Sequence, residues 1–175
     1  MTAVTSNGLP IALSGALPAI GSTAPDFLLV DKDLNDLTLK TFSRKAKILY
    51  TVPSLDTPVC ATSSKRFDEL LKDLDEVAVC SVSADLPFAM RRFCNTQVTS
   101  CITPLSLMRT RKFAEDYGVL ITGGRMAGLA ARAVIVIDRN DRVVYTELVK
   151  DMAKEPDYAS AVAAAKACIE DGSSF

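Results

Sequence analysis

The chain has 175 residues, of which 49% are hydrophobic and 23% are charged, and its 20 basic residues nearly balance 21 acidic ones. This length and composition predict one folded domain over residues 1–175, and they argue against disorder, a nucleic-acid partner and a membrane surface. The absence of histidine excludes Ser-His and Cys-His hydrolases and histidine-ligated metal centres.

Residues 1–20 carry no charge and predict an N-terminal β-hairpin extension. Asn7-Gly8 favours the positive φ angles of a type I′ turn between two short strands. A secretory signal is not expected, because no basic residue precedes the apolar stretch and Pro10, Gly15 and Pro18 interrupt it.

Beyond the hairpin, strand-like and helix-like segments alternate along the chain. Asp85 is interpreted as a helix cap, Pro104 as the end of a strand, and residues 119–130 as a flexible glycine-containing loop. The alternation closes with a hairpin and a helix, which predicts an α/β fold of the thioredoxin-like type with three α/β/α layers. Strands are predicted at residues 27–30, 37–39, 48–52, 77–82, 101–102, 133–137 and 143–149, and helices at about 58–74, 85–94, 110–117 and 156–169.

The chain contains five widely spaced cysteines and no CxxC motif, which argues against a disulfide scaffold and a zinc knuckle. We therefore expect a cytoplasmic protein with reduced thiols. Cys80 lies in an apolar run and Cys168 in an alanine-rich helix, so both are expected to be structural.

Cys60 occupies a position that favours a reactive thiol. Thr57 is a suitable N-cap and Pro58 suits the first helical position, so Cys60 falls in the first turn of a helix, where unpaired N–H groups favour negative charge. The Thr57 hydroxyl lies one turn earlier and is expected within reach of the sulfur. The alternative is a small residue packed at a helix start, with Thr57 acting only as a cap.

The spacing Pro53-x3-Thr57-x2-Cys60 resembles the signature of the peroxiredoxins. The longer segment is similar to the bacterial-type thiol peroxidase branch, an atypical two-cysteine group. The likeness covers nearly the whole chain in the expected order, and its other blocks are at residues 83–94, 128–138 and 155–158.

The resemblance implies a role for each matching residue. Cys60 resembles the peroxidatic cysteine, which becomes a sulfenic acid, and Cys94 resembles the resolving cysteine, which then forms an intramolecular disulfide with it. Thr57 resembles the residue that orients peroxide, Pro53 the one that shields the sulfur from solvent, and Arg132 the arginine that stabilises thiolate and peroxide. For Arg132 a surface ion pair is the alternative. The active-site role is favoured, because Arg132 begins the apolar run 133–137 and a charge beside a buried strand usually has a partner.

The resemblance also implies partners. Hydrogen peroxide and organic hydroperoxides would be the substrates, a thioredoxin-type dithiol protein the reductant, and a homodimer the assembly, with no cofactor or metal. A peroxide-responsive redox sensor using the same switch is an alternative function. A thiol–disulfide oxidoreductase is disfavoured, since no second cysteine lies close to Cys60. Cys101, seven residues past Cys94, is the alternative resolving thiol.

Overall fold

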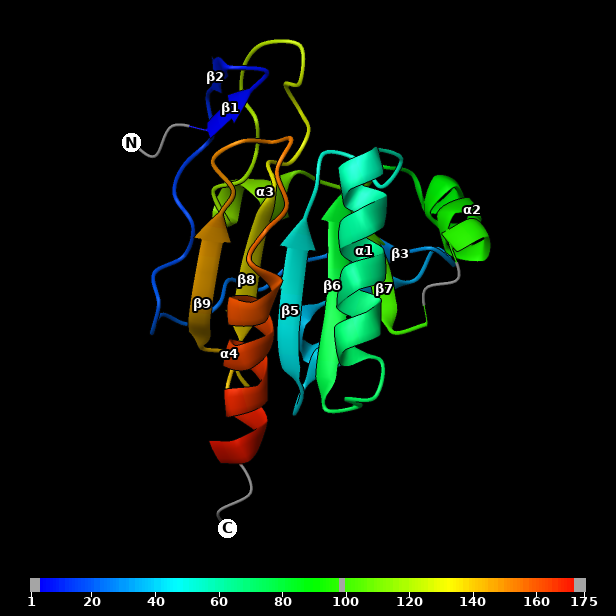
Figure 1. The fold of residues 1–175 in the computed structure, drawn as a ribbon, viewed down its shortest axis with the longest axis vertical. Helices are drawn as coiled ribbons and strands as arrows, with labels where there is room; N and C mark the ends of the chain where they lie inside the picture. Colours follow the sequence, from blue (N-terminus) through cyan, green and yellow to red (C-terminus); the bar gives the residue numbers. More distant parts are fainter. Residues whose placement is uncertain (1–3, 98–99, 172–175) are drawn as a thin grey trace.

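The computed structural model describes residues 4–97 and 100–171. Within these ranges the chain forms a two-stranded sheet and a seven-stranded sheet, the latter in the order β4-β3-β7-β6-β5-β8-β9 (Figure 1). The strands are β1 (Val4–Ser6), β2 (Leu9–Ile11), β3 (Leu29–Asp31), β4 (Asp36–Leu37), β5 (Ala46–Thr51), β6 (Val77–Ser83), β7 (Ile102–Ser106), β8 (Ala133–Ile137) and β9 (Val143–Leu148). The helices are α1 (Pro58–Leu71), α2 (Pro87–Gln97), α3 (Lys112–Asp116) and α4 (Tyr158–Glu170), with a 3-10 helix at Leu39–Phe42.

The larger sheet separates two apolar cores. Its central strands β5, β6 and β7 run parallel, and β8 pairs antiparallel with β5. Successive side chains of a strand point to opposite faces, so Ile48 and Tyr50 pack with α1 and α4, while Leu49 packs on the other side with Phe113 of α3. Figure 1 shows α1 and α4 on the same face of the sheet and α2 to one side. The predicted α/β architecture is confirmed.

The N-terminal hairpin is also confirmed. Val4 pairs with Ile11, and the turn residues Asn7 and Gly8 have φ angles of 51° and 76°. Positive φ at both positions is what a type I′ turn requires.

The segment 119–130, predicted as a flexible loop, forms hydrogen bonds with a part of the chain that is distant in sequence. The Ser14 amide donates to the Leu120 carbonyl and the Thr122 amide donates to the Ala12 carbonyl, each at 2.9 Å. These bonds hold the segment against the chain that follows the hairpin, and the two regions lie side by side in Figure 1. The segment is therefore a hydrogen-bonded part of the fold.

Pro104 does not end a strand, contrary to the sequence interpretation. It lies inside β7, opposite Ser81 of β6. On the other side of β7, pairing with β3 begins only at Leu105. Pro104 thus has a strand neighbour on one side alone, an edge-like setting in which proline is tolerated.

The last helix begins later than predicted, at Tyr158, because Asp157 acts as its N-cap and accepts a hydrogen bond from the Ser160 amide at 3.0 Å.

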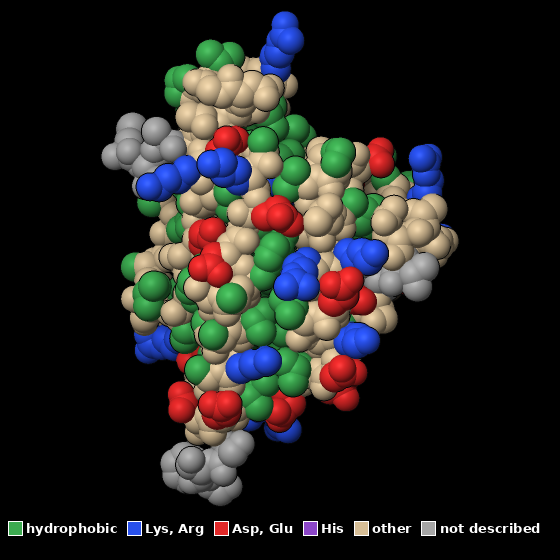
Figure 2. All heavy atoms as spheres, in the orientation of Figure 1, with side chains coloured by type: hydrophobic (Ala, Val, Ile, Leu, Met, Phe, Trp, Pro, Cys, Tyr) green, Lys and Arg blue, Asp and Glu red, His purple; other side chains and the backbone are tan. Residues whose placement is uncertain are grey.

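In the described part of the chain, no helix is both long and apolar enough to cross a bilayer. On the face shown in Figure 2, acidic and basic side chains are interspersed over α1 and α4.

Candidate active site

The loop between β5 and α1 brings Cys60 to the end of the central strands. The chain leaves β5 at Thr51, passes the buried Pro53, and enters α1 at Pro58. Thr57 is the N-cap, and its hydroxyl oxygen accepts the Cys60 amide at 3.4 Å. Cys60 therefore lies in the first turn of the helix, as predicted, where backbone N–H groups and the helix dipole favour an anion.

Two donors point at the sulfur of Cys60. The Thr57 hydroxyl donates to Sγ at 2.7 Å and Nη1 of Arg132 donates at 3.3 Å. Cys60 itself is 0% exposed. A buried sulfur that receives a hydroxyl and a guanidinium donor is arranged to hold negative charge.

Arg132 is also buried, with 2% of its surface exposed. Its Nε and Nη2 donate to the Met152 carbonyl at 3.2 and 3.1 Å, and its Nη1 donates to the Tyr50 hydroxyl at 2.6 Å. Burial lowers the pKa of Arg132, but Tyr50 and Cys60 raise it, and the net shift is upward.

No carboxylate of the described residues forms an ion pair with Arg132. The alternative of a surface ion pair for this arginine is therefore wrong. Its neighbours are a neutral hydroxyl, a carbonyl and the Cys60 sulfur. The thiolate of Cys60 is the anion that its charge can stabilise.

The other thiols have different surroundings. Burial raises the pKa of Cys80 to about 12, and burial together with Asp68 raises that of Cys101 to about 12. Burial also raises the pKa of Cys168. These three cysteines therefore hold their protons at neutral pH, and all five are reduced in the structure.

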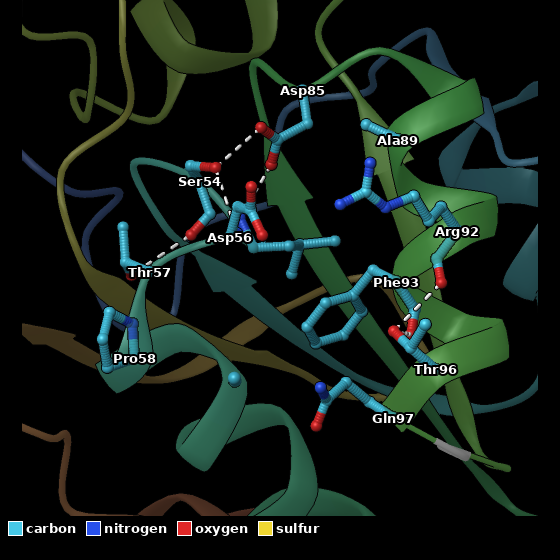
Figure 3. A pocket seen from close by; sticks show the side chains of 12 residues that line it. Ser54, Asp56, Thr57, Pro58, Asp85, Ala89, Arg92, Phe93, Thr96 and Gln97 are labelled. Carbon is cyan, nitrogen blue, oxygen red and sulfur yellow. Dashed lines mark hydrogen bonds between the residues drawn. The ribbon is translucent and has the colours of Figure 1, made fainter.

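A pocket of about 420 Å³ opens between the loop that precedes α1 and helix α2. Thr57 and Pro58 border it on one side (Figure 3). Arg92 and Phe93 point into it from α2. Cys94, the next residue, is half-buried on this helix. The structure thus brings Thr57, Cys60 and Arg132 together and places Cys94 on the helix that forms the opposite wall.

Asp85 does not cap α2 as its sequence position suggests. Its carboxylate accepts the Ser54 hydroxyl, the Leu55 amide and the Ser83 hydroxyl, each at 2.7 Å. The side chain is used to hold the loop before Cys60 to the end of β6 (Figure 3). Three charge-assisted hydrogen bonds to one carboxylate make this a strong anchor for that loop.

Sequence reasoning missed three contributors to the site: Tyr50, the Met152 carbonyl and the anchoring role of Asp85. Strand alternation could have indicated Tyr50, since it shares a face of β5 with Ile48 beneath α1. Nothing in the sequence indicates the Met152 carbonyl, because backbone acceptors carry no residue signature. In the described ranges, no group of three His, Cys, Asp or Glu residues could hold a metal ion.

The fold and the site together define a thioredoxin-like thiol peroxidase. A family model described as Redoxin matches residues 19–162. The thiol peroxidase of Leptospira interrogans is 43% identical over 171 residues, covering 97% of this chain and all of the relative. That of Mycobacterium bovis is 47% identical over 164 residues, covering 94% of this chain and 98% of the relative.

Solved structures agree. A peroxiredoxin-like protein from Aquifex aeolicus has a TM-score of 0.90 at 39% identity, covering 96% of this chain and 98% of its own. A thiol peroxidase from Chromobacterium violaceum has a TM-score of 0.86 at 25% identity, covering 97% and 96%. The chain belongs to the redoxin family, in its bacterial-type thiol peroxidase branch. It is an oxidoreductase that reduces peroxide.

Proposed function

We propose that the chain reduces hydrogen peroxide and organic hydroperoxides with the thiolate of Cys60. The observation that carries the proposal is the pair of donors on Sγ, the Thr57 hydroxyl and Arg132 Nη1. They stabilise the thiolate before reaction, and they remain beside the reacting atoms when a peroxide enters.

In the first step, the thiolate attacks one oxygen of R–O–O–H and the O–O bond breaks. Sulfur is oxidised to the sulfenic acid, and the peroxide leaves as R–O⁻, which takes a proton from solvent to become an alcohol or water. Negative charge moves from sulfur to the departing oxygen. Arg132 is always protonated, so it can stabilise that charge as it develops. The Thr57 hydroxyl can also donate to the Ser54 carbonyl, at 3.3 Å. With its proton directed there, the Thr57 oxygen can accept a hydrogen bond from the peroxide O–H. The buried Pro53 lies in the loop between β5 and α1 and is proposed to shield the sulfur.

In the second step, the thiol of Cys94 attacks the sulfenic sulfur, which forms a Cys60–Cys94 disulfide and releases water. Cys60 is buried in α1, and Cys94 lies on α2 across the pocket. Closing the bond requires Cα atoms within about 7 Å. The end of α2 is proposed to unwind locally for this step.

In the third step, a thioredoxin-type dithiol reduces the disulfide and is itself oxidised, which restores both thiols. We propose that the protein works as a homodimer. The cytoplasmic location and the single domain over residues 1–175 stay predictions.

The test is a thiol count after one equivalent of hydrogen peroxide, followed by disulfide mapping by mass spectrometry. We expect the loss of two thiols and a Cys60–Cys94 bridge, with Cys168→Ser behaving as wild type. Cys60→Ser should lose no thiols, and Cys94→Ser should stop at a sulfenic acid on Cys60. A Cys60–Cys101 bridge would overturn the assignment of Cys94, and a Cys60 no more reactive than Cys168 would overturn the whole proposal.

A redox sensor would use the same chemistry without sustained turnover. Steady consumption of peroxide with thioredoxin, its reductase and NADPH supports the peroxidase. One oxidation event per chain, with no recycling by any dithiol, would instead favour the sensor.

A further inference from the structure

Tyr50 hydrogen-bonds Arg132 but has no role in the mechanism proposed above. It lies on β5, is 1% exposed, and its hydroxyl accepts from Arg132 Nη1 at 2.6 Å. The same nitrogen donates to the Cys60 sulfur at 3.3 Å. An Nη nitrogen carries two hydrogens. With one directed at Tyr50, the other is directed at the sulfur.

Tyr50 orients this nitrogen without cancelling its charge. Burial raises the pKa of Tyr50 to about 12, so the phenol is neutral at physiological pH. The remaining acceptor of Arg132 is the Met152 carbonyl, which is also neutral. A carboxylate in place of the phenol would form an ion pair and withdraw the guanidinium charge from the sulfur. Two neutral acceptors leave that charge available to the thiolate and to peroxide.

Tyr50 is itself held rigidly. Its ring lies 5.4 Å from that of Phe67, which packs edge-on against Tyr158 at 5.0 Å. Phe67 belongs to α1 and Tyr158 to α4, and the Tyr158 hydroxyl hydrogen-bonds the Ser63 hydroxyl of α1 at 2.7 Å. The ring of Tyr50 therefore packs on α1, which α4 supports in turn, and an immobile acceptor fixes its donor.

We propose that Tyr50 is a positioning residue for peroxide reduction, which holds Arg132 Nη1 so that one N–H faces Cys60 Sγ and the incoming peroxide. The inference rests on the proposed role of Cys60 and adds a residue that acts through Arg132. Tyr50 does not touch the sulfur by any hydrogen bond within the described structure.

The test is Tyr50→Phe, which keeps the ring and removes the hydroxyl. The matched control is Tyr117→Phe, since Tyr117 is a buried tyrosine whose hydroxyl donates to the Pro25 carbonyl at 2.7 Å, away from the site. In stopped-flow oxidation, we expect the second-order rate constant of Tyr50→Phe to fall about tenfold, the order expected for a hydrogen bond to a charged group. The later, peroxide-independent step should keep its rate, and Tyr117→Phe should match wild type in both steps.

A double-mutant cycle with Arg132→Lys separates positioning from general structure. If Tyr50 acts through the guanidinium, adding Tyr50→Phe to Arg132→Lys should change the oxidation rate by less than about twofold. A full tenfold fall in both backgrounds would overturn the proposal. So would a single variant that oxidises as fast as wild type.

Two further readouts keep the result decisive. If Tyr50→Phe does not fold, Phe67→Leu keeps the phenol but removes the ring that packs against it, and it is expected to slow oxidation by a smaller factor. An unchanged rate in that folded variant would count against the inference. A wild-type chain that fails to react with peroxide at Cys60 would overturn the proposed function, whereas a fast wild type with an equally fast Tyr50→Phe overturns only the role of Tyr50.

Discussion

The two helices that carry the proposed reactive cysteines are anchored very differently. Over 14 residues, α1 buries five, and these include Cys60 and Phe67. Over 11 residues, α2 buries only Pro87 and Met90, and Cys94 is half-buried. In Figure 1, α1 lies over the sheet while α2 stands at its side. Elements with few buried contacts open at low free-energy cost. A firmly anchored α1 suits the proposed reaction of Cys60 with peroxide, and an α2 with few buried residues suits the proposed local unwinding that would bring Cys94 to it.

The largest expected effect is on the free energy of unfolding. It is measured by comparing the loss of one phenylalanine from α1 with the loss of one from α2. Phe67→Ala removes a fully buried ring between Tyr50 and Tyr158 and should lower the free energy of unfolding by about 3–5 kcal/mol. Phe93→Ala removes a half-buried ring of α2 and should cost only about 1 kcal/mol. Urea unfolding at pH 7 measures both. Equal losses would contradict the difference in anchoring.

A smaller effect is expected at the start of α1. Thr57→Val keeps the shape of the side chain but removes both the cap and the donor to Sγ. The oxidation rate constant should fall about tenfold, and stability by about 1 kcal/mol. Thr57→Ser, which retains the hydroxyl, should stay within about threefold of wild type. Stopped-flow kinetics should place the loss in the oxidation step alone. A loss in the later step would contradict this expectation, because it would show that Thr57 at the start of α1 also affects the proposed unwinding of α2.

The smallest expected effect is on stability, and it concerns the hydrogen bonds between α1 and the chain that follows α2. Asp68 of α1 accepts the Ser100 and Cys101 amides, each at 2.7 Å, just beyond α2. Burial raises the pKa of Asp68, but the hydrogen bonds from Cys101 and Ser100 lower it, and the net shift is downward. A depressed folded pKa stabilises the folded state above the unfolded value of about 3.9, and this contribution is lost as the pH falls through the folded value.

Asp68→Asn should therefore cost about 1 kcal/mol at pH 7, and the difference from wild type should shrink below about pH 4. Urea unfolding at pH 7, 4.5 and 3 measures this. Asp73→Asn changes an exposed carboxylate of the described chain and should leave the curve unaltered. A difference that grew on acidification would reverse the assigned sign.

The sequence predicted those features that residues close together in the chain determine. The Thr57 cap and Pro58 fix the start of α1, and the strand at Ala133–Ile137 was predicted with its observed limits. The sulfur contacts of Thr57 follow from one helical turn. The contact of Arg132 with Cys60 joins residues 72 positions apart, and the resemblance to a family, not the spacing, indicated it.

The errors came from partners distant in sequence. Asp85 precedes a helix and looks like its cap, but Ser54 and Leu55, about 30 positions away, take its carboxylate. Pro104 looks like a strand terminator, but β7 continues through it, because Pro104 has a strand neighbour on one side only. In both cases tertiary contacts outweighed a local preference, which a single sequence does not reveal.

The neutral surroundings of Arg132 have a consequence for experiment. Tyr50 titrates near pH 12, a carbonyl does not titrate, and the chain has no histidine. Between about pH 5 and 8, no ordinary side chain beside the sulfur gains or loses a proton. Across that range the charge of Arg132 and the neutrality of its two acceptors therefore stay constant, so these groups add no pH dependence of their own to the oxidation rate.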